Sequence, residues 1–172
     1  MMVLALLAAL VGDAPPAFPD PIAPASEGKA QCYSPNIARK VCASLAIYGR
    51  GADGGLVNTT TVLLANAPPI TMTTVSNVTD SNGRLCGVMQ IAELDAAKFT
   101  VSGAPADAAR ADQLHTAVAN AFASIIDHTL CVSFVVDGSG FTARSTLDSV
   151  PRPTLDQRVI WVSPTDGWKV AP

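Results

Sequence analysis

The stretch Ile70–Glu93 reads ITMTTVSNVTDSNGRLCGVMQIAE, and it decides the fold that we expect for this chain. Its first half is rich in β-branched residues, which favour strands. Asn82-Gly83 is a strong hairpin signal, because both residues accept the positive φ angles of a type I′ turn. We therefore expect a strand over Ile70–Thr79 and an antiparallel return strand over Arg84–Glu93.

Other β-rich runs, separated by turn residues, lie on both sides of this hairpin. We expect a first hairpin from Ser44–Tyr48 and Leu56–Ala65, a later one from Thr129–Val136 and Phe141–Leu147, a last one from Arg158–Ser163 and Trp168–Val170, and a short strand over Lys98–Ser102. Hairpins that follow one another along a chain predict an antiparallel sheet.

One segment, Ala104–Asp127, has the period of an amphipathic helix instead. Leu114, Val118, Phe122 and Ile125 form its apolar stripe, which must be covered by another layer. No β-α-β crossover is required to connect these elements. The predicted fold class is therefore α+β, an antiparallel sheet of successive hairpins with one long amphipathic helix packed on it and two disulfides.

The four cysteines, Cys32, Cys42, Cys86 and Cys131, are even in number and include no C-x-x-C pair. Four cysteines allow three pairings, and the short first spacing favours Cys32–Cys42 with Cys86–Cys131. The alternative is four reduced thiols in a cytosolic protein. Only two histidines are present and neither has zinc-finger spacing, so we predict no metal and no cofactor.

The amino-terminal segment points to export. Val3–Val11 is an apolar run of the length found in signal peptides, and residues 15–31 are rich in proline and alanine. We predict a signal peptide over 1–14, an extended tether over 15–31 and a single globular domain over 32–172, located in the periplasm or secreted. The alternative for the apolar run is a buried first strand or helix.

Composition narrows the classes of partner. Hydrophobic residues make up 49% of the chain and charged residues 15%, which indicates a globular protein. The net charge is −3 and the 11 Lys and Arg residues are scattered, so the chain lacks the basic stripe that binds nucleic acid. We expect no nucleic acid and no membrane span in the mature chain. The expected partner class is an envelope or extracellular protein.

His115 and His128 are the candidate catalytic residues, because histidine is the most common general acid or base. On one continuous helix they would lie about 20 Å apart along the axis and roughly 140° apart around it. They are therefore not expected to share a substrate through the helix. Each also has a structural interpretation, as a boundary residue for His115 and as a cation at the helix end for His128.

Other chemistry-bearing residues are better interpreted as structural. Ser139 lies in a Gly-x-Gly turn rather than a nucleophile elbow, and Asp53, Asp80, Asp137 and Asp166 are expected turn residues. Trp161 and Trp168 are expected to stack across the last hairpin. Asp112 stands three residues before His115, a spacing that is common on solvated helix faces.

We interpret the chain as an exported, non-enzymatic binding or interaction module. The alternative is a small secreted hydrolase that uses His115 or His128 with a distant Asp or Ser. A histidine bonded to a carboxylate within a cleft would favour the hydrolase, whereas packed or fully solvated histidines would favour the binding module.

Overall fold

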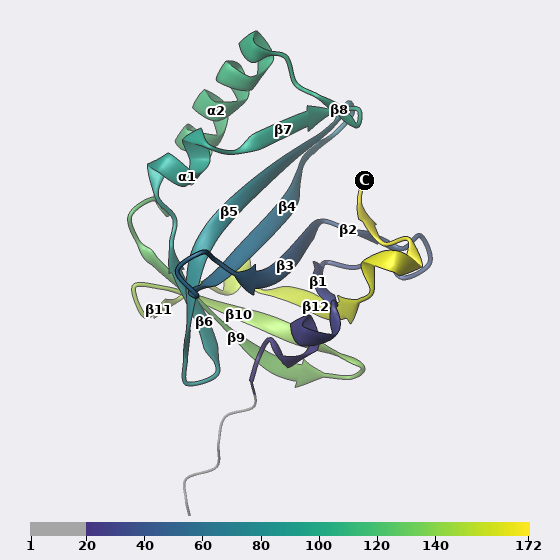
Figure 1. The fold of residues 1–172 in the computed structure, drawn as a ribbon, viewed down its shortest axis with the longest axis vertical. Helices are drawn as coiled ribbons and strands as arrows, with labels where there is room; N and C mark the ends of the chain where they lie inside the picture. The colour runs from purple at the N-terminus through teal and green to yellow at the C-terminus, as the bar shows by residue number, and fades with distance from the viewer. Residues whose placement is uncertain (1–19) are drawn as a thin grey trace, which may run out of the picture.

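The computed structural model describes residues 20–172, and its main feature is a closed barrel of eight antiparallel strands (Figure 1). The order around the barrel is β4 (Leu56–Asn66), β3 (Ser44–Arg50), β1 (Ala30–Tyr33), β12 (Gln157–Val162), β10 (Gly140–Leu147), β9 (Thr129–Asp137), β6 (Arg84–Val88) and β5 (Pro69–Ser81). Pairing of β5 with β4 closes the ring. The predicted signal peptide, residues 1–14, lies outside the described residues.

The predicted α+β class is therefore wrong, because the strands form a mostly β barrel rather than an open sheet carrying a helix. Local turn signals identify hairpins but carry no information on which distant strands meet. Here β1 pairs with both β3 and β12, and β12 pairs with β10. These long-range pairings join the hairpins into a ring.

Three of the expected hairpins are present. β3 pairs with β4, β5 pairs with β6, and β9 pairs with β10. Asn82 and Gly83 have φ angles of 55° and 74°, as a type I′ turn requires. The return strand β6 ends at Val88, however, and Ile91–Asp95 form a short helix, α1. The prediction of a strand up to Glu93 is therefore wrong.

An extension stands on one side of the barrel, and it exists because β5 changes partner along its length. Ile70–Thr73 pair with β7 (Lys98–Val101), whereas Thr79–Ser81 pair with β6. β8 (Ala104–Pro105) pairs with β7, and α2 (Ala108–Phe122) follows it. In Figure 1, α1 and α2 lie beside β7 at the end of the molecule away from β9.

The helices pack on the extension through an apolar cluster. Its buried members are Ile70, Met72, Leu94, Ala97, Phe99, Leu114 and Val118, with Phe122 partly buried against it. Leu114 and Val118 are thus buried as predicted, but α2 is shorter than the predicted helix 104–127. Asp107 is its N-cap, since the carboxylate accepts a hydrogen bond from the backbone N–H of Arg110 at 2.8 Å.

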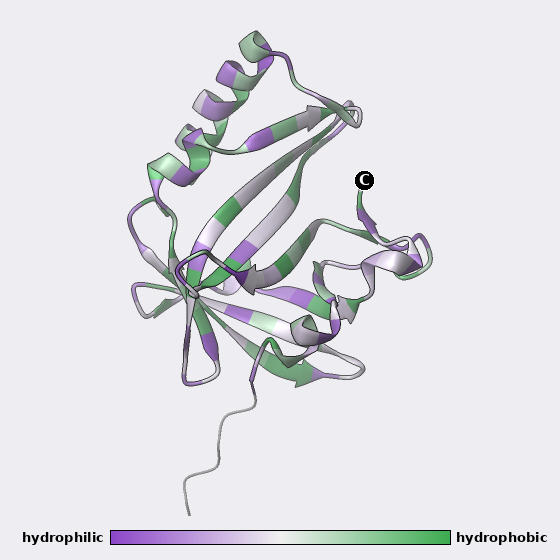
Figure 2. Cartoon of the chain, in the orientation of Figure 1, coloured by the Kyte–Doolittle hydropathy of each residue, from purple (hydrophilic) through white to green (hydrophobic). Residues whose placement is uncertain are grey.

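The barrel interior is lined by small and polar residues as well as apolar ones. Residues opposite each other on neighbouring strands share a face. Gln31 therefore faces inward with Ala46 and Trp161, and all but Trp161 are buried. Figure 2 shows hydrophobic, neutral and hydrophilic positions interspersed along β4 and β5.

A second apolar cluster lies on the outside of the barrel and contains the disulfide Cys32–Cys42. Its buried members are Ala30, Cys32, Cys42 and Val162, and Trp168 packs against them. β2 (Val41–Cys42) and β13 (Lys169–Val170) pair in parallel as a separate two-stranded sheet. Pro164–Asp166 form a 3-10 turn instead of a hairpin loop. The predicted last hairpin is therefore wrong.

Regular structure is present before residue 32 in the described chain. A 3-10 turn covers Ala23–Glu27, and Ala30 and Gln31 belong to the barrel strand β1, although we predicted a tether over 15–31. Both residues are fully buried. The sequence of β1 is only four residues long and lacks β-branched residues, so propensity does not reveal it.

Candidate functional site

The site lies where β5 parts from β6 and β6 leads into α1. β6 pairs with β5 only from Arg84 to Cys86, after which Gly87 and Val88 pair with β9 alone. The divergence leaves a pocket of about 280 Å³, which we call the β5–β6 pocket. It is lined by Asn77, Thr79, Cys86, Gly87, Val88, Gln90, Glu93 and Thr129.

Polar residues from three parts of the chain line this pocket. Asn77 and Thr79 come from β5, Gln90 and Glu93 from the start of α1, and Thr129 from the start of β9. Two amides and two hydroxyls offer both donors and acceptors of hydrogen bonds. The pocket can therefore bond a ligand that presents both kinds of group.

Glu93 supplies the single charged group of the lining. Its Oε2 accepts a hydrogen bond of 2.8 Å from the hydroxyl of Ser76 on β5. This bond fixes α1 to the strand and holds the carboxylate at the pocket. The Glu93 side chain is only partly exposed.

Gly87 is required by the close approach of two backbones in the pocket wall. A Cβ at this position would lie 3.1 Å from the carbonyl oxygen of Asn77 and 3.4 Å from Cγ1 of Val78. A larger residue would push β5 and β6 further apart. The neighbouring Cys86 is bonded to Cys131 of β9, which fixes the other side of the wall.

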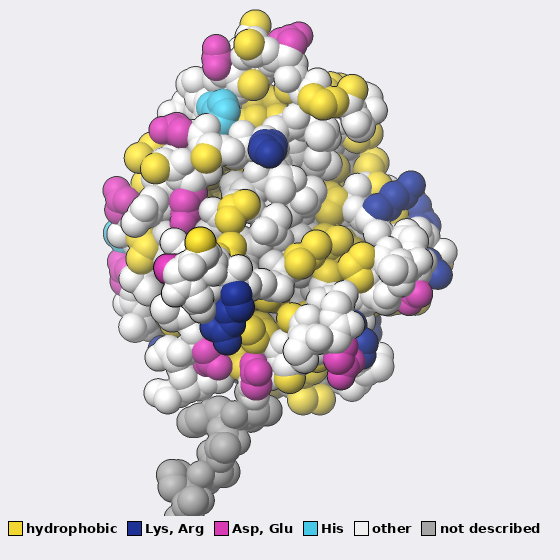
Figure 3. Space-filling view, viewed as in Figure 1, with side chains coloured by type: hydrophobic (Ala, Val, Ile, Leu, Met, Phe, Trp, Pro, Cys, Tyr) yellow, Lys and Arg dark blue, Asp and Glu magenta, His cyan; other side chains and the backbone are white. Residues whose placement is uncertain are grey.

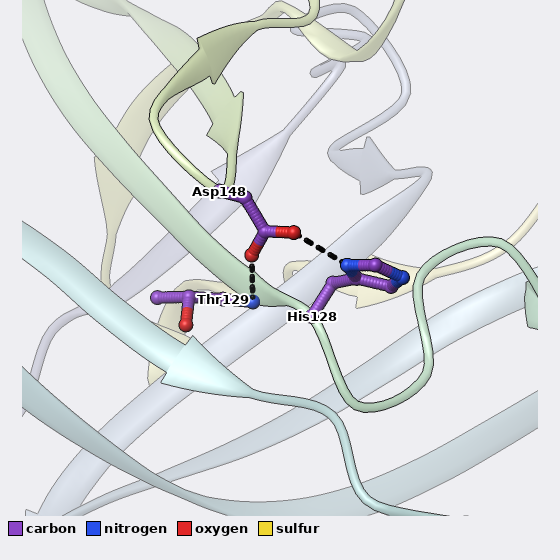
Figure 4. A network of polar contacts seen from close by, with 3 residues as sticks. All are labelled: His128, Thr129 and Asp148. Atoms are coloured by element: carbon purple, nitrogen blue, oxygen red, sulfur yellow. Dashed lines mark hydrogen bonds and ion pairs between the residues drawn. The ribbon is translucent and has the colours of Figure 1, made fainter.

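His128 and Asp148 form a polar contact just outside the pocket (Figure 4). The Nδ1 of His128 lies 2.5 Å from Oδ2 of Asp148, while Oδ1 of the same carboxylate accepts the backbone N–H of Thr129. The hydrogen bond to His128 is the main cause that lowers the pKa of Asp148, with the Thr129 bond second.

The exposure of this pair decides how it can be interpreted. The side chains of His128 and Asp148 are 48% and 52% exposed, and neither lines the pocket. The pair thus meets one condition for a catalytic dyad, a histidine oriented by a carboxylate, but not the second, enclosure in a cleft. Among residues 20–172, no serine or threonine hydroxyl bonds to His128.

Asp148 sits in an unusual turn. Asp148 and Ser149 have φ angles of 47° and 69° and join β10 to β11 (Val150–Pro151) in a two-residue hairpin. Positive φ at a serine is uncommon and costs free energy. The backbone N–H of Asp148 also bonds to the carbonyl of Thr129. Thr129 and Asp148 therefore hold each other through both backbone and side chain.

His115 is placed far from a catalytic arrangement. Its ring packs edge-on against Phe99, with centroids 4.8 Å apart, and its buried Nδ1 has no hydrogen-bond partner in the described part of the chain. It does not bond to Asp112. The structure does not bring His115 and His128 together in one site.

The remaining candidates have local roles. Asp53 and Asp80 accept backbone N–H groups in their own turns, and Asp137 accepts the Thr142 hydroxyl. Ser139 is exposed in the β9–β10 turn. The expected stacking of Trp161 on Trp168 is wrong, since Trp161 lies inside the barrel and Trp168 in the outer cluster.

A partly buried polar cluster inside the barrel was not foreseen. Tyr33 and Tyr48 each donate a hydrogen bond of 2.8 Å to Oε1 of Gln31. Burial raises the pKa of Tyr33 to about 12 and also raises the pKa of Tyr48. The two residues stand 15 positions apart in sequence, on β1 and β3, so only the strand pairing could have revealed the cluster.

The outer wall next to the pocket is largely uncharged. Ile47, Thr59 and Val75 are aligned across β3, β4 and β5, and Ile47 and Val75 are exposed. Figure 3 shows mainly hydrophobic side chains and white atoms, which are other side chains or backbone, over β4 and β5, with most charged side chains toward the rim. Val75 precedes the pocket residue Asn77 by two positions and shares its face of the strand.

Fold and site together define an eight-stranded antiparallel barrel with a polar pocket at the split between two strands and a two-helix extension beside it. Comparisons with protein-family models, with curated proteins and with solved structures found no match. Between residues 20 and 172, no helix has the length and apolar character needed to cross a membrane. In the same range, no three His, Cys, Asp or Glu residues gather as metal ligands.

Proposed function

We propose that this chain is an exported, non-enzymatic binding module that takes a small polar ligand in the β5–β6 pocket. The observation that carries the proposal is the convergence of Asn77, Gln90 and Glu93 on one pocket from two separate elements. Pockets with a few convergent polar groups are the usual sites of small ligands. At about 280 Å³ the pocket suits a ligand smaller than a typical drug.

A binding role is favoured over catalysis because of what the lining contains. In the described structure the pocket has one carboxylate, and no histidine or free thiol lines it. Hydrolysis by side chains needs a base next to a nucleophile or an activated water. Apart from Glu93, whose Oε2 already accepts the Ser76 hydroxyl, the polar side chains of the lining are amides and hydroxyls, which bind and orient rather than transfer protons near neutral pH.

The experiment is a ligand titration followed by backbone NMR. D-glucose, glycerol and L-serine amide are added separately to ¹⁵N-labelled protein, and we expect shift changes concentrated at Asn77, Gly87 and Gln90. Asn77→Ala with Gln90→Ala should weaken binding about tenfold, because both amides are lost. Both side chains are exposed, so the variant should fold.

Gln113→Ala is the matched control, since it removes an exposed amide on α2, which contributes no residue to the pocket lining. If none of the three compounds shifts a pocket resonance at its highest soluble concentration, the proposed function is wrong.

The proposed location is the periplasm or the extracellular space. The two disulfides support it, because such bonds persist in oxidising compartments. Cell fractionation and intact-mass measurement of protein from the native host test the location. We expect an amino terminus cleaved before Ala30, since cleavage after that point would remove part of β1.

The second candidate is a small secreted hydrolase that uses His128. It is favoured by the bond between His128 and Asp148 and by Thr129, which both bonds to Asp148 and lines the pocket. For a binding module, His128→Ala and His115→Ala should leave the function largely intact. A hundredfold loss of a measured turnover in a folded His128→Ala variant would favour the hydrolase instead.

A further inference from the structure

We infer that the β5–β6 pocket selects a small protonated amine flanked by hydroxyl groups, such as an amino sugar. The inference rests on the proposed function and adds the chemical class of the ligand. It is carried by the position of Glu93, a partly buried carboxylate without a positive partner, among neutral hydrogen-bonding groups.

Glu93 is the residue of the lining that favours a cationic ligand. One carboxylate oxygen accepts the Ser76 hydroxyl, and the second has no hydrogen bond within residues 20–172. The ion pairs found there are Lys29–Glu27 and His128–Asp148, so no side-chain cation neutralises Glu93. A carboxylate partly removed from water is stabilised by a cation placed against it.

A protonated amine fits this carboxylate better than a metal ion. Calcium takes six to eight oxygen ligands and usually several carboxylates, whereas the lining provides only one. An ammonium group is satisfied by three acceptors. The lining includes three such acceptors in the free oxygen of Glu93 and the amide oxygens of Gln90 and Asn77.

The neutral groups favour hydroxyls beside the amine. The Thr79 hydroxyl donates to the carbonyl of Cys86 at 3.3 Å and can still accept, the Thr129 hydroxyl can donate and accept, and the NH₂ groups of Asn77 and Gln90 donate. No aromatic ring lines the pocket in the described structure, so the lining has no ring to stack on a flat apolar ligand. A compound rich in hydroxyl groups therefore uses more of the lining than an alkyl amine does.

The test compares four probes on the whole protein by the same NMR titration at about pH 6, where the amines are protonated. They are D-glucosamine, D-glucose, N-acetyl-D-glucosamine and ethanolamine. D-glucosamine should bind at least tenfold more tightly than D-glucose or the N-acetyl compound, which lack the charge. Ethanolamine carries one hydroxyl and separates open-chain amino alcohols from amino sugars, and it should bind more weakly than D-glucosamine.

Glu93→Gln should abolish the preference for the amine, so that this variant binds D-glucosamine no more tightly than D-glucose. Glu27→Gln is the matched control, because it removes the same charge from an exposed residue outside the pocket. A measurement on the wild type needs no variant: at about pH 9 the amine of D-glucosamine loses its proton, and the preference should disappear.

Each outcome is informative. Equal binding of D-glucosamine and D-glucose by wild type would overturn the amine inference while leaving a polar-ligand pocket. Ethanolamine binding as tightly as D-glucosamine would overturn the choice of an amino sugar. If no probe shifts a pocket resonance, both the inference and the proposed function are wrong.

Discussion

The hydroxyl of Tyr48 donates a hydrogen bond of 2.8 Å to Oε1 of Gln31 inside the barrel, and Tyr33 donates a second to the same oxygen. Gln31 is fully buried, and its Nε2 has no partner among the described residues. Replacing Gln31 by Met would keep the volume but leave both hydroxyls without an acceptor. We expect a loss of about 1–3 kcal/mol in unfolding free energy, measured by urea denaturation.

Tyr48→Phe is the comparison for that variant. It removes one donor and leaves the acceptor bonded to Tyr33, so the loss should be about 1 kcal/mol. A Gln31→Met protein as stable as wild type would show that these bonds contribute nothing.

The same cluster predicts an alkaline transition. Tyr33 and Tyr48 are the two tyrosines of the chain, and the folded state raises the pKa of both, that of Tyr33 to about 12. A raised pKa means that the unfolded state loses its protons first. Stability should therefore be complete below about pH 10 and fall as the pH rises toward 12. Tyrosinate absorbance and circular dichroism should change together, and tyrosinate formed at pH 10 without unfolding would contradict this.

At low pH, protonation of Asp148 should lower the stability of the fold. Its lowered folded pKa contributes stability that is present above its ordinary pKa of 3.8 and lost as the pH falls below it. Asp148→Asn should be less stable than wild type at neutral pH, and the difference should shrink in acid. Urea denaturation at about pH 7 and about pH 3 measures it. A difference that does not change with pH would rule out ionisation of Asp148 as the cause.

The two disulfides should differ in access to reductant. Cys86 lines the β5–β6 pocket, whereas Cys32 and Cys42 are 0% and 1% exposed. Thiol exchange requires attack at an accessible sulfur. Mild reduction of native protein, followed by alkylation and peptide mapping, should open Cys86–Cys131 first. In denaturant, the control, both should open together, and prior opening of Cys32–Cys42 in native protein would contradict the prediction.

The helical extension gives a packing prediction. Leu114 is 8% exposed within the cluster, so Leu114→Ala should lower the unfolding free energy by about 2–5 kcal/mol. Phe122 is only partly buried, and Phe122→Ala should cost less than the 3–5 kcal/mol expected for a buried ring. Urea denaturation of both variants tests which of them loses more unfolding free energy. A larger loss at Phe122 would place the main contact at the carboxyl end of α2.

Local elements were predictable from the sequence where the chain itself carries the signal. The positive φ angles at Asn82-Gly83 follow from residue type, and the burial of Leu114 and Val118 follows from helical period. Barrel closure depends on the pairing of β1 with β12, which joins residues near opposite ends of the chain. No local pattern specifies such a pairing, so the open sheet could not be distinguished from the ring.

The candidate site was predictable only in part for the same reason. The pairing of Cys86 with Cys131 agrees with the spacing argument. The pocket brings together Asn77, Glu93 and Thr129, none of which belongs to a motif. His128 was a candidate, but its partner Asp148 comes from a turn with two positive φ angles. Neither position of that turn is a Gly or Asn, so the sequence does not indicate the turn.

The register of β6 and β9 has a consequence for how the chain is assembled. Val88 and Thr129 lie directly opposite each other, so residues 89–128 leave the barrel and return to it at one rung of the ladder. In modular terms, this segment is an insertion between two adjacent barrel strands. A short turn in its place would uncover the β4 and β5 residues of the apolar cluster, which are Val62, Leu64, Ala65, Ile70 and Met72. The pocket is thus shared between the two parts, with Gln90 and Glu93 on the insertion and Asn77 on the barrel.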